Sequence, residues 1–400
     1  MLHFLGFMMN NYLRLIALFF LFSISAIYGV EQQIDLGFET RVFNTDSNDY
    51  KQKRSDSAAV LKVEFVHHLD NGLDSITFIP FARFQLYDEE RTHFDIRELY
   101  WESLGDNWEL KVGIGQEYWG VTEFVHLVNA INQVDMLEGI DEEDRLGELM
   151  IKYTQLSSIG QFDFFLLPFF RPREYPGVEG RLRTPFLIDS NDSLYESSRN
   201  ERKIEAAVRY SQTFNNVDLG LSLFHGTQRD AQFKFNKVKN KIIPYYAKST
   251  QLGVDLQMAI KEWLIKAEFV GRRIDTIEHL ALTGGFEYSF IGIMETEFDL
   301  GLIVEGAWQN KRDRYSAFSD EIIFGQRLAF NNELGSELLF GYIYDIHHNS
   351  SVLSLEASSR VNNSIKLSVE GRIFQKIGNN DPFKTFEDED HLNLELTWYF

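Results

Sequence analysis

The chain has 400 residues, of which 44% are hydrophobic and none is cysteine. Its 60 acidic residues against 39 basic ones give a net charge of −21. This balance argues against nucleic acid as a partner, because phosphate binding requires a basic surface. The apolar fraction is too low for a bundle of lipid-facing helices. The absence of cysteine excludes disulfides, thiolate metal sites and a cysteine nucleophile.

The first distinct segment is an apolar run from Leu15 to Tyr28 that follows the single charge of Arg14. It is short for a membrane-spanning helix, and it ends in small residues such as Ala26 and Gly29 before polar sequence begins. This pattern is typical of a secretory signal peptide. We therefore predict a cleaved signal peptide over residues 1–29 and a mature domain over residues 30–400, with an uncleaved N-terminal anchor as the alternative.

From residue 33 onward the dominant pattern is the alternation of apolar and polar side chains, which is most regular from His391 to Phe400. Period two is typical of β-strands with one apolar and one polar face. The polar face carries charges in the middle of nearly every strand, which suits a wet lumen better than a packed interior. The apolar face is therefore predicted to contact lipid.

The alternation predicts eighteen strands. Their approximate ranges are 33–43, 58–67, 75–87, 94–103, 108–116, 147–155, 161–170, 202–212, 217–227, 245–257, 262–272, 280–290, 294–308, 319–330, 336–345, 351–361, 364–374 and 390–400. The fourth and seventh strands alternate poorly, around Ile96 and Phe164, so sixteen strands is the alternative. Pro80 lies inside the third strand and cannot donate to a sheet ladder, which predicts a bulge or a break in pairing there.

The connections between these strands differ in length on the two sides. After even-numbered strands they are tight turns such as Asn215-Asn216 and Asn331-Asn332. After odd-numbered strands they are longer and charged, at 44–57, 88–93, 117–146, 171–201, 228–244, 273–279, 309–318, 346–350 and 375–389. Short periplasmic turns and long extracellular loops are typical of bacterial outer-membrane barrels. We therefore predict an all-β, transmembrane, antiparallel up-and-down barrel that is integral to the outer membrane.

The predicted lumen is mixed in charge, and its arrangement provides candidate pore residues. Four basic residues fall on one arc of the wall, in the half nearer the long loops: Arg41, Lys62, Arg83 and Arg372. Lys111 is a further inward base. The thirteenth strand carries acids on another arc: Glu295, Glu297, Asp299 and Glu305. A basic arc that faces acidic groups would produce a transverse field across the lumen, whereas pairing of charges between neighbouring strands is the simpler interpretation.

The loop 117–146 is the candidate constriction, because thirty residues exceed what a strand connection needs. Its segment from Val125 to Val134 has helix-like apolar spacing, so it could fold inward and pack against the wall. Four acids of this loop are candidates for the constriction itself: Asp135, Glu138, Asp141 and Glu142. The acidic run 141–144 could face the basic arc, remain a solvated surface run, or share a weak divalent cation with lipopolysaccharide.

The loop 171–201 opens with the most basic stretch of the chain, which contains Arg171, Arg173, Arg181 and Arg183. Such a cluster at a channel mouth could select acidic or sugar-like solutes. Alternatively, these arginines pair with the acidic residues 138–144 and fasten two loops together. Both interpretations predict that the two loops interact.

As a whole, the signal peptide, the alternating strands and a last strand ending in Phe400 resemble Gram-negative outer-membrane porins. A terminal aromatic residue resembles the signal that the outer-membrane assembly machinery reads. A local likeness at 97–135 is similar to uncharacterised porin-like families near the alginate-export group. Its matching positions are Arg97, Glu98, Trp108, Val112, Gly113, Trp119, Gly120, Asn132 and Asp135.

These features favour a channel for passive or substrate-selective diffusion of small hydrophilic solutes, embedded among outer-membrane lipid and lipopolysaccharide as a monomer or trimer. The alternative is a structural or adhesive barrel, or a subunit of an export assembly. A barrel hydrolase is less favoured, because no GxSxG or HExxH motif accompanies His67, His68, His225, His279, His347 and His348. We expect no enzymatic activity, no cofactor and no metal site.

Overall fold

The computed structural model describes residues 29–47, 49–69, 72–311 and 320–400. The predicted signal peptide, apart from Gly29, lies outside these residues. Within them, no helix is long and apolar enough to cross a membrane. The helical elements of the described residues are four short 3₁₀ turns, η1 (Ser190–Asp192), η2 (Asn200–Arg202), η3 (Ile293–Glu295) and η4 (Pro382–Phe386).

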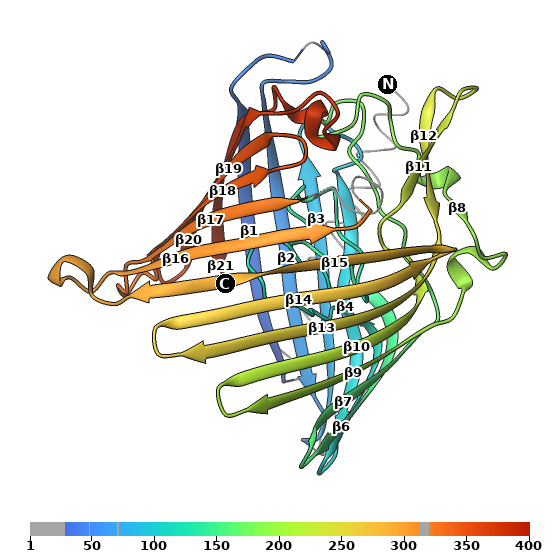
Figure 1. The fold of residues 1–400 in the computed structure, drawn as a ribbon, viewed down its shortest axis with the longest axis vertical. Coiled ribbons are helices and arrows are strands. Elements are labelled where there is room, and N and C mark those ends of the chain that lie inside the picture. The colour runs from blue at the N-terminus through green and yellow to red at the C-terminus, as the bar shows by residue number, and fades with distance from the viewer. Residues whose placement is uncertain (1–28, 48, 70–71, 312–319) are drawn as a thin grey trace.

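Eighteen strands form one antiparallel sheet that closes on itself, because the last strand pairs with the first (Figure 1). In chain order they are β1 (Val30–Phe43), β2 (Ser55–His68), β3 (Asp74–Gln85), β4 (His93–Leu104), β5 (Trp108–Gly115), β6 (Glu148–Ser157), β7 (Gly160–Leu167), β9 (Glu205–Phe214), β10 (Val217–Thr227), β13 (Lys248–Ile260), β14 (Trp263–Ile274), β15 (Ile277–Phe290), β16 (Asp299–Gln309), β17 (Glu321–Ala329), β18 (Glu337–Asp345), β19 (Ser350–Asn362), β20 (Ile365–Lys376) and β21 (His391–Tyr399). Each overlaps a predicted strand. The prediction of eighteen strands is confirmed, and the alternative of sixteen is wrong.

The two faces of the wall differ as period two requires. On β1, Phe38 is 50% exposed, whereas its neighbour Glu39 is 6% exposed. On β15, Leu280 and Leu282 are exposed while Ala281 and Thr283 are buried. Exposed apolar side chains therefore cover the outside, and the inward face is enclosed. Aromatic pairs such as Trp263 with Tyr288 lie near the short turns, where outer-membrane barrels carry an interfacial girdle.

One irregularity explains why β4 alternates poorly. Ile79 pairs with Glu98 and Pro80 pairs with Ile96, so the register shifts by one residue between these two pairs. Arg97 is the extra residue, and a bulge of this kind lets adjacent side chains share one face. The predicted irregularity at Pro80 is confirmed.

The loops follow the predicted asymmetry with some corrections. Asp275 and Thr276 alone join β14 to β15, so the longer connection predicted at 273–279 is wrong. Asp275 has φ 52°, in the left-handed region that such a tight turn uses. β16 begins at Asp299, so Glu295 and Glu297 belong to a turn and not to the acidic arc of the wall. The segment from Val125 to Val134 forms no helix.

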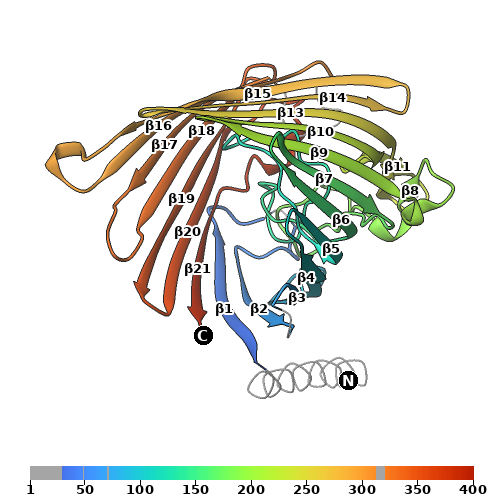
Figure 2. The same ribbon diagram turned by 90° about the horizontal axis from the view of Figure 1, so that it is seen from below.

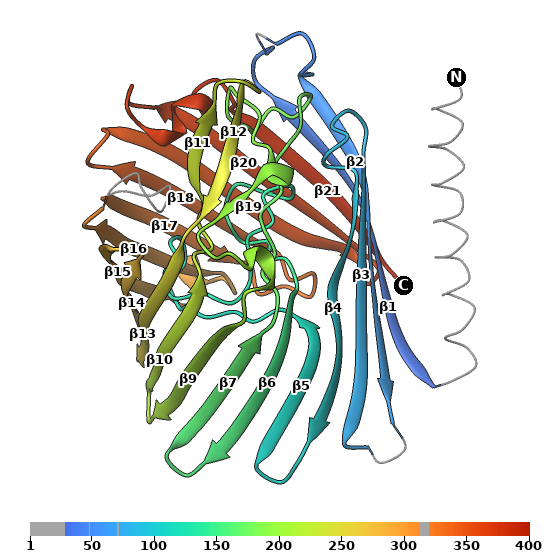
Figure 3. The same ribbon diagram turned by 90° about the vertical axis from the view of Figure 1, so that its right-hand side faces the viewer.

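A small second sheet was not predicted. It contains β8 (Leu194–Tyr195), β11 (Gln232–Asn236) and β12 (Lys241–Tyr246). The first two lie within predicted loops, and β12 runs from the predicted loop 228–244 into the first two residues of the strand predicted at 245–257. Figures 1 and 3 place the β11–β12 hairpin at the same end of the barrel as the long loops.

Candidate functional site

The connection from β5 to β6, residues 116–147, leaves the wall through a junction built on Asn132. The Asn132 side chain is fully buried. Its amide nitrogen donates to the carbonyls of Gly115 and Leu146 at 2.8 and 2.9 Å, and its oxygen accepts from the backbone of Glu117 at 2.7 Å. One side chain thus joins the two ends of the loop to its middle. Figure 2 shows teal loop segments within the ring of strands.

A fully buried carboxylate on β14, that of Glu268, binds residues 121–128 of this loop. Its Oε1 accepts from the backbone of Val121 at 2.7 Å and from the backbone and hydroxyl of Thr122 at 3.1 and 2.7 Å. Its Oε2 accepts from the backbone of Leu127 and Val128 at 2.7 and 3.2 Å. Four backbone amides therefore converge on one carboxylate, which supplies them with an acceptor from the wall. The Thr122 hydroxyl shares its proton between Glu268 and the carbonyl of Val125, which is also 2.7 Å away.

Other inward side chains extend this attachment. Glu305 on β16 accepts from the backbone of Glu123 and Phe124 at 2.8 and 3.1 Å. Arg272 on β14 donates to the carbonyl of Leu127 at 2.7 Å. The Phe124 ring lies against the glycines of two further strands, since a Cβ at Gly325 or Gly341 would come within 3.2 or 2.7 Å of it. The loop thus contacts the wall far from β5 and β6, where it begins and ends.

Apolar side chains of the loop support the same placement. Leu127, Val128 and Ile131 are buried in one cluster with residues from β6, β7, β14 and β15. The segment is irregular and not helical, so its spacing does not create a helix face. Burial of these side chains nevertheless stabilises the position of the loop, by about 25 cal/mol for each Å² of apolar surface removed from water.

The predicted basic and acidic groups meet at Arg83. Its guanidinium donates to both oxygens of Glu138, at 2.5 to 3.0 Å, and to Glu39 on β1 at 2.7 Å. Burial alone would raise the pKa of Glu138, but the Arg83 guanidinium outweighs it and holds the pKa below its usual value. Glu138 is therefore ionised and fixed in position beside the wall.

Further pairs join the same loop to other strands. Arg372 on β20 contacts Asp141 at 2.8 Å. Arg97, at the bulge of β4, contacts Asp135 at 2.7 Å and Asp95 at 3.0 Å. The structure thus brings Arg83, Arg372, Asp135, Glu138 and Asp141 together along one loop–wall junction, which we call the charged junction.

Arg41 joins this group through Glu39, at 3.4 Å. Lys111 contacts Glu117 at 3.6 Å, near the start of the loop. Lys62 differs: it is exposed, aligns with Asp35 deeper in the wall, and forms no ion pair among the described residues. Arg41, by contrast, aligns with Asp56 at the loop end of β2. The register thus places Lys62 farther from the long loops than Arg41, and its role as a pore residue stays a prediction.

The acidic run 141–144 is unevenly paired. Glu142 is 3.8 Å from Arg173. Burial, followed by repulsion from Glu138 and Asp141, raises the pKa of Asp144 to about 7. Burial, followed by repulsion from Asp141 and Glu356, also raises the pKa of Glu143 to about 7. Both residues keep some contact with solvent. Their ionised forms are nevertheless disfavoured, because protein surrounds much of each carboxyl group and other acids lie nearby.

The arginines of the loop 171–201 do not share one partner. Arg171 contacts Asp95 at 2.7 Å, and Arg173 contacts Asp230 at 2.7 Å in addition to Glu142. Arg181 contacts Glu389 at 2.6 Å and Arg183 contacts Asp49 at 3.3 Å. Of the predicted pairing with residues 138–144, only the Arg173–Glu142 contact is present; the other three arginines tie their loop to β4 and to other loops.

Sequence reasoning missed the role of Glu268, Glu305 and Arg91. The alternation placed Glu268 and Glu305 on the inner face, but nothing in the sequence indicates which inward acid meets a distant loop backbone. Arg91 lies in the loop between β3 and β4, where it donates to the carbonyl of Leu137 at 2.7 Å. No local pattern distinguishes it from an ordinary solvated arginine.

Two groups of side chains have metal-compatible geometry, although no metal site was predicted. They are His93 with Asp135 and Glu138, and Asp345 with His348 and Asp381. The acids of the first group are already engaged by Arg97 and Arg83, which disfavours a cation there. Each group combines two residues three apart in sequence with a third from a distant part of the chain, so spacing alone does not reveal the complete set.

Cavities lie on both sides of the loop 116–147. One, lined by Tyr118, Gly120 and Arg209, includes residues of the short-turn end such as Ser157 and Thr213. Another is lined by Ile140, Glu142 and Arg372 together with residues of the long-loop end such as Asp345 and Phe383. The loop therefore separates two spaces within the barrel.

The chain matches no protein-family model and no curated protein. Its likeness to known proteins lies in the fold. A BenF-like porin from Pseudomonas fluorescens Pf-5 aligns with a TM-score of 0.56 and 11% sequence identity, over 93% of this chain and 98% of that chain. The chain has a porin fold. A mutant of the Rh. blastica porin aligns with a TM-score of 0.46 and 9% identity, over 93% of this chain and all of that one. The likeness to alginate-export families stays a prediction.

Proposed function

We propose that this porin-fold protein is an outer-membrane channel through which small hydrophilic solutes diffuse. The observation that carries the proposal is the charged junction inside a closed barrel of eighteen strands. Barrels of 16–18 strands are wide enough to enclose an aqueous lumen. A loop that narrows such a lumen determines which solutes pass.

The charges at the junction support a selective and not merely open pore. Arg41, Arg83 and Arg372 belong to the wall, whereas Asp135, Glu138 and Asp141 belong to the loop. Arg83 contacts Glu138 directly and Arg372 contacts Asp141 directly, so no solute passes between them. These pairs instead form one charged edge of the opening, and such an edge favours polar solutes. The same ion pairs hold the loop in place, so selectivity and position depend on the same residues.

The proposed setting follows from the two ends of the chain. Residues 1–29 are proposed to direct export and to be removed, and Phe400 to be read by the outer-membrane assembly machinery. Lipid and lipopolysaccharide would then surround the apolar exterior, in a monomer or a trimer. We propose no catalytic role, since His225 lies on the outer face beside Thr250 whereas His279 is buried against Gln309.

The test is electrical. The chain 30–400, purified and inserted into planar bilayers, should give discrete conductance steps, and liposomes that contain it should swell in small sugars. A preparation heated to unfolding before insertion serves as the control for membrane leakage. Absence of both steps and swelling would contradict the proposal.

One observation favours a second candidate, a structural or adhesive barrel. Phe233 and Phe235 on β11 are about half exposed at the long-loop end, and exposed aromatic side chains are typical of contact surfaces. Deletion of residues 232–246 distinguishes the two. Under the channel proposal the conductance steps persist without the hairpin, whereas an adhesive barrel loses its surface binding and has no steps in either form.

A further inference from the structure

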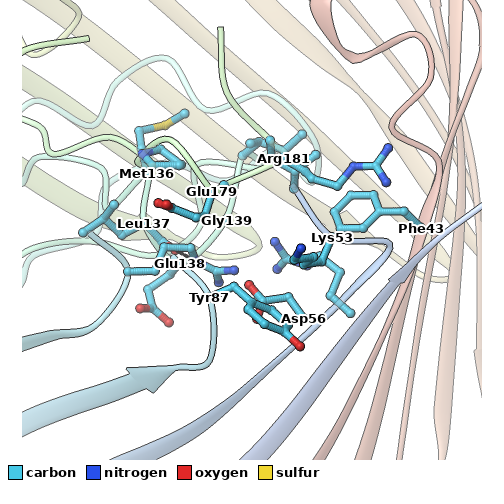
Figure 4. A pocket seen from close by; sticks show the side chains of 16 residues that line it. Phe43, Lys53, Asp56, Tyr87, Met136, Leu137, Glu138, Gly139, Glu179 and Arg181 are labelled. Carbon is cyan, nitrogen blue, oxygen red and sulfur yellow. Dashed lines mark hydrogen bonds between the residues drawn. The ribbon is translucent and has the colours of Figure 1, made fainter. Parts of the chain in front are cut away.

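Arg41 and Arg91 line one pocket beside the charged junction. Arg41 comes from β1 and Arg91 from the loop between β3 and β4. The pocket is bounded by residues 136–140 of the constricting loop and by residues 179–182. Figure 4 shows Phe43 and Lys53 on one side of it and Leu137 and Glu138 on the other.

Neither guanidinium has all its hydrogen bonds. Arg41 is 8% exposed and Arg91 is 6% exposed. The Nε of Arg41 and the Nη2 of Arg91 have no hydrogen-bond partner among the described residues. A buried charged donor without an acceptor is costly. Two such donors in one pocket indicate that an acceptor belongs there.

The carboxylates in contact with these arginines are also shared. Glu39 is shared by three arginines, at 2.7 Å from Arg83, 3.4 Å from Arg41 and 3.8 Å from Arg91. Glu138 is taken by Arg83. Three guanidinium groups therefore share two carboxylates in contact with them, while Glu370 and Asp88 act on Arg41 and Arg91 only at longer range.

The other acids near the pocket balance the charge in number, but among the described residues they make no ion pair with Arg41 or Arg91. Asp56 aligns with Arg41 in the strand register, but among the described residues no ion pair joins them. Lys53 and Glu179 also line the pocket and balance each other in number. Burial, together with repulsion from Arg41 and Arg83, lowers the pKa of Arg91 to about 10. This direction fits a cation held beside other cations.

We propose that this pocket is a subsite for a single oxyanion group, a carboxylate or a phosphate, held between Arg41 and Arg91. Guanidinium groups bind both kinds of oxyanion through parallel hydrogen bonds. The inference rests on the proposed function, since it names a chemical group that solutes passing the loop would carry. An oxyanion in this subsite would accept the hydrogen bonds that Arg41 Nε and Arg91 Nη2 lack.

The test uses the chain 30–400 with chloride as the only other anion. Inorganic phosphate and acetate are added separately, and two quantities are followed: the single-channel current and the heat of binding to the detergent-solubilised protein. We expect saturable binding and a saturable fall in current. Arg41→Gln and Arg91→Gln should each weaken the apparent affinity by about tenfold or more. Arg360→Gln, an exposed arginine at the end of β19 near the short turns, should keep it.

The outcomes separate the sources of the oxyanion. Stronger binding of phosphate identifies solutes that carry a phosphate, and stronger binding of acetate identifies carboxylate solutes; both support the subsite. No saturable binding of either anion, or equal affinity in all three variants and the wild type, overturns it. Channel steps in chloride alone report on the proposed function, and calorimetry tests the subsite whether or not those steps are seen.

Discussion

The carboxylate of Glu268 accepts hydrogen bonds from both the backbone and the hydroxyl of Thr122, at 3.1 and 2.7 Å, across 146 residues of sequence. Thr122 belongs to the loop 116–147, whereas Glu268 belongs to β14. This contact ties the first part of the constricting loop to a strand that is distant from β5 and β6. Glu268 is therefore one of the wall residues that fix the position of the loop, together with Glu305 and Arg272.

Replacement of that acid should release the loop. In Glu268→Ala the four backbone amides lose their acceptor, whereas the Thr122 hydroxyl keeps the carbonyl of Val125; the loss costs about 2–4 kcal/mol of loop attachment. We expect larger and noisier single-channel currents than in the wild type. Glu278→Gln is the matched control, because Glu278 is an exposed acid on the neighbouring strand β15. Identical currents in Glu268→Ala and wild type would show that the loop does not limit the pore.

The Arg83–Glu138 pair should control ion selectivity. Arg83→Gln leaves Glu39 and Glu138 without their shared cation, so the reversal potential in a KCl gradient should shift toward cation selectivity. Glu138→Gln should shift it toward anions. Either change alone breaks a buried ion pair and should destabilise the protein by about 3–5 kcal/mol. The double variant serves as the control, and its selectivity should lie between those of the single variants. Equal reversal potentials in all forms would place the pair outside the ion path.

Selectivity should also depend on pH through the acidic run. The pKa values of Glu143 and Asp144 are each raised to about 7. Between about pH 6 and about pH 8 both groups ionise, so the loop becomes more negative and cation selectivity should rise. The folded state holds more protons here than the unfolded chain, whose carboxyl groups ionise at about pH 4. Their contribution to stability is therefore complete in acid and is lost as the pH rises through about 7.

The double variant Glu143→Gln with Asp144→Asn provides the control for this dependence. Its reversal potential should vary less with pH over the same range. Its unfolding midpoint should fall less than that of the wild type as the pH rises. If the variant keeps the full pH dependence of the wild type, other groups are responsible.

The strands could be predicted because their physics is local. Alternation over a few residues is enough to place β21, from His391 to Tyr399, and asparagine turns such as Asn215 with φ 55° end strands by backbone preference alone. The prediction that Glu295 lies on the wall is wrong for a related reason. The alternation begins before Asp299, within the turn that precedes β16. Only the pairing of Asp299 with Ala329 marks where the ladder begins.

The charged junction could be predicted only in part. Alternation identifies Arg83 as an inward residue, and the length of the loop draws attention to Glu138. That these two meet depends on Asn132, Glu268 and the apolar cluster, which together fix the path of the loop. Lys62 shows the limit of the same reasoning. Alternation shows that two residues share the inner face, but only the strand register shows how far along the barrel axis each one lies.

A final prediction concerns Gly113 on β5, one of the positions in the local likeness to porin-like families. Its φ is +142°, and a Cβ there would lie 2.1 Å from the carbonyl oxygen of Leu99 on β4. Gly113→Ala must therefore separate two paired strands or distort them, and we expect little folded barrel, measured as loss of the heat-modifiable band on gels. Gly371→Ala is the matched control, because its nearest neighbour would lie at an ordinary 3.6 Å. Normal assembly of Gly113→Ala would mean that β4 and β5 can move apart without loss of closure.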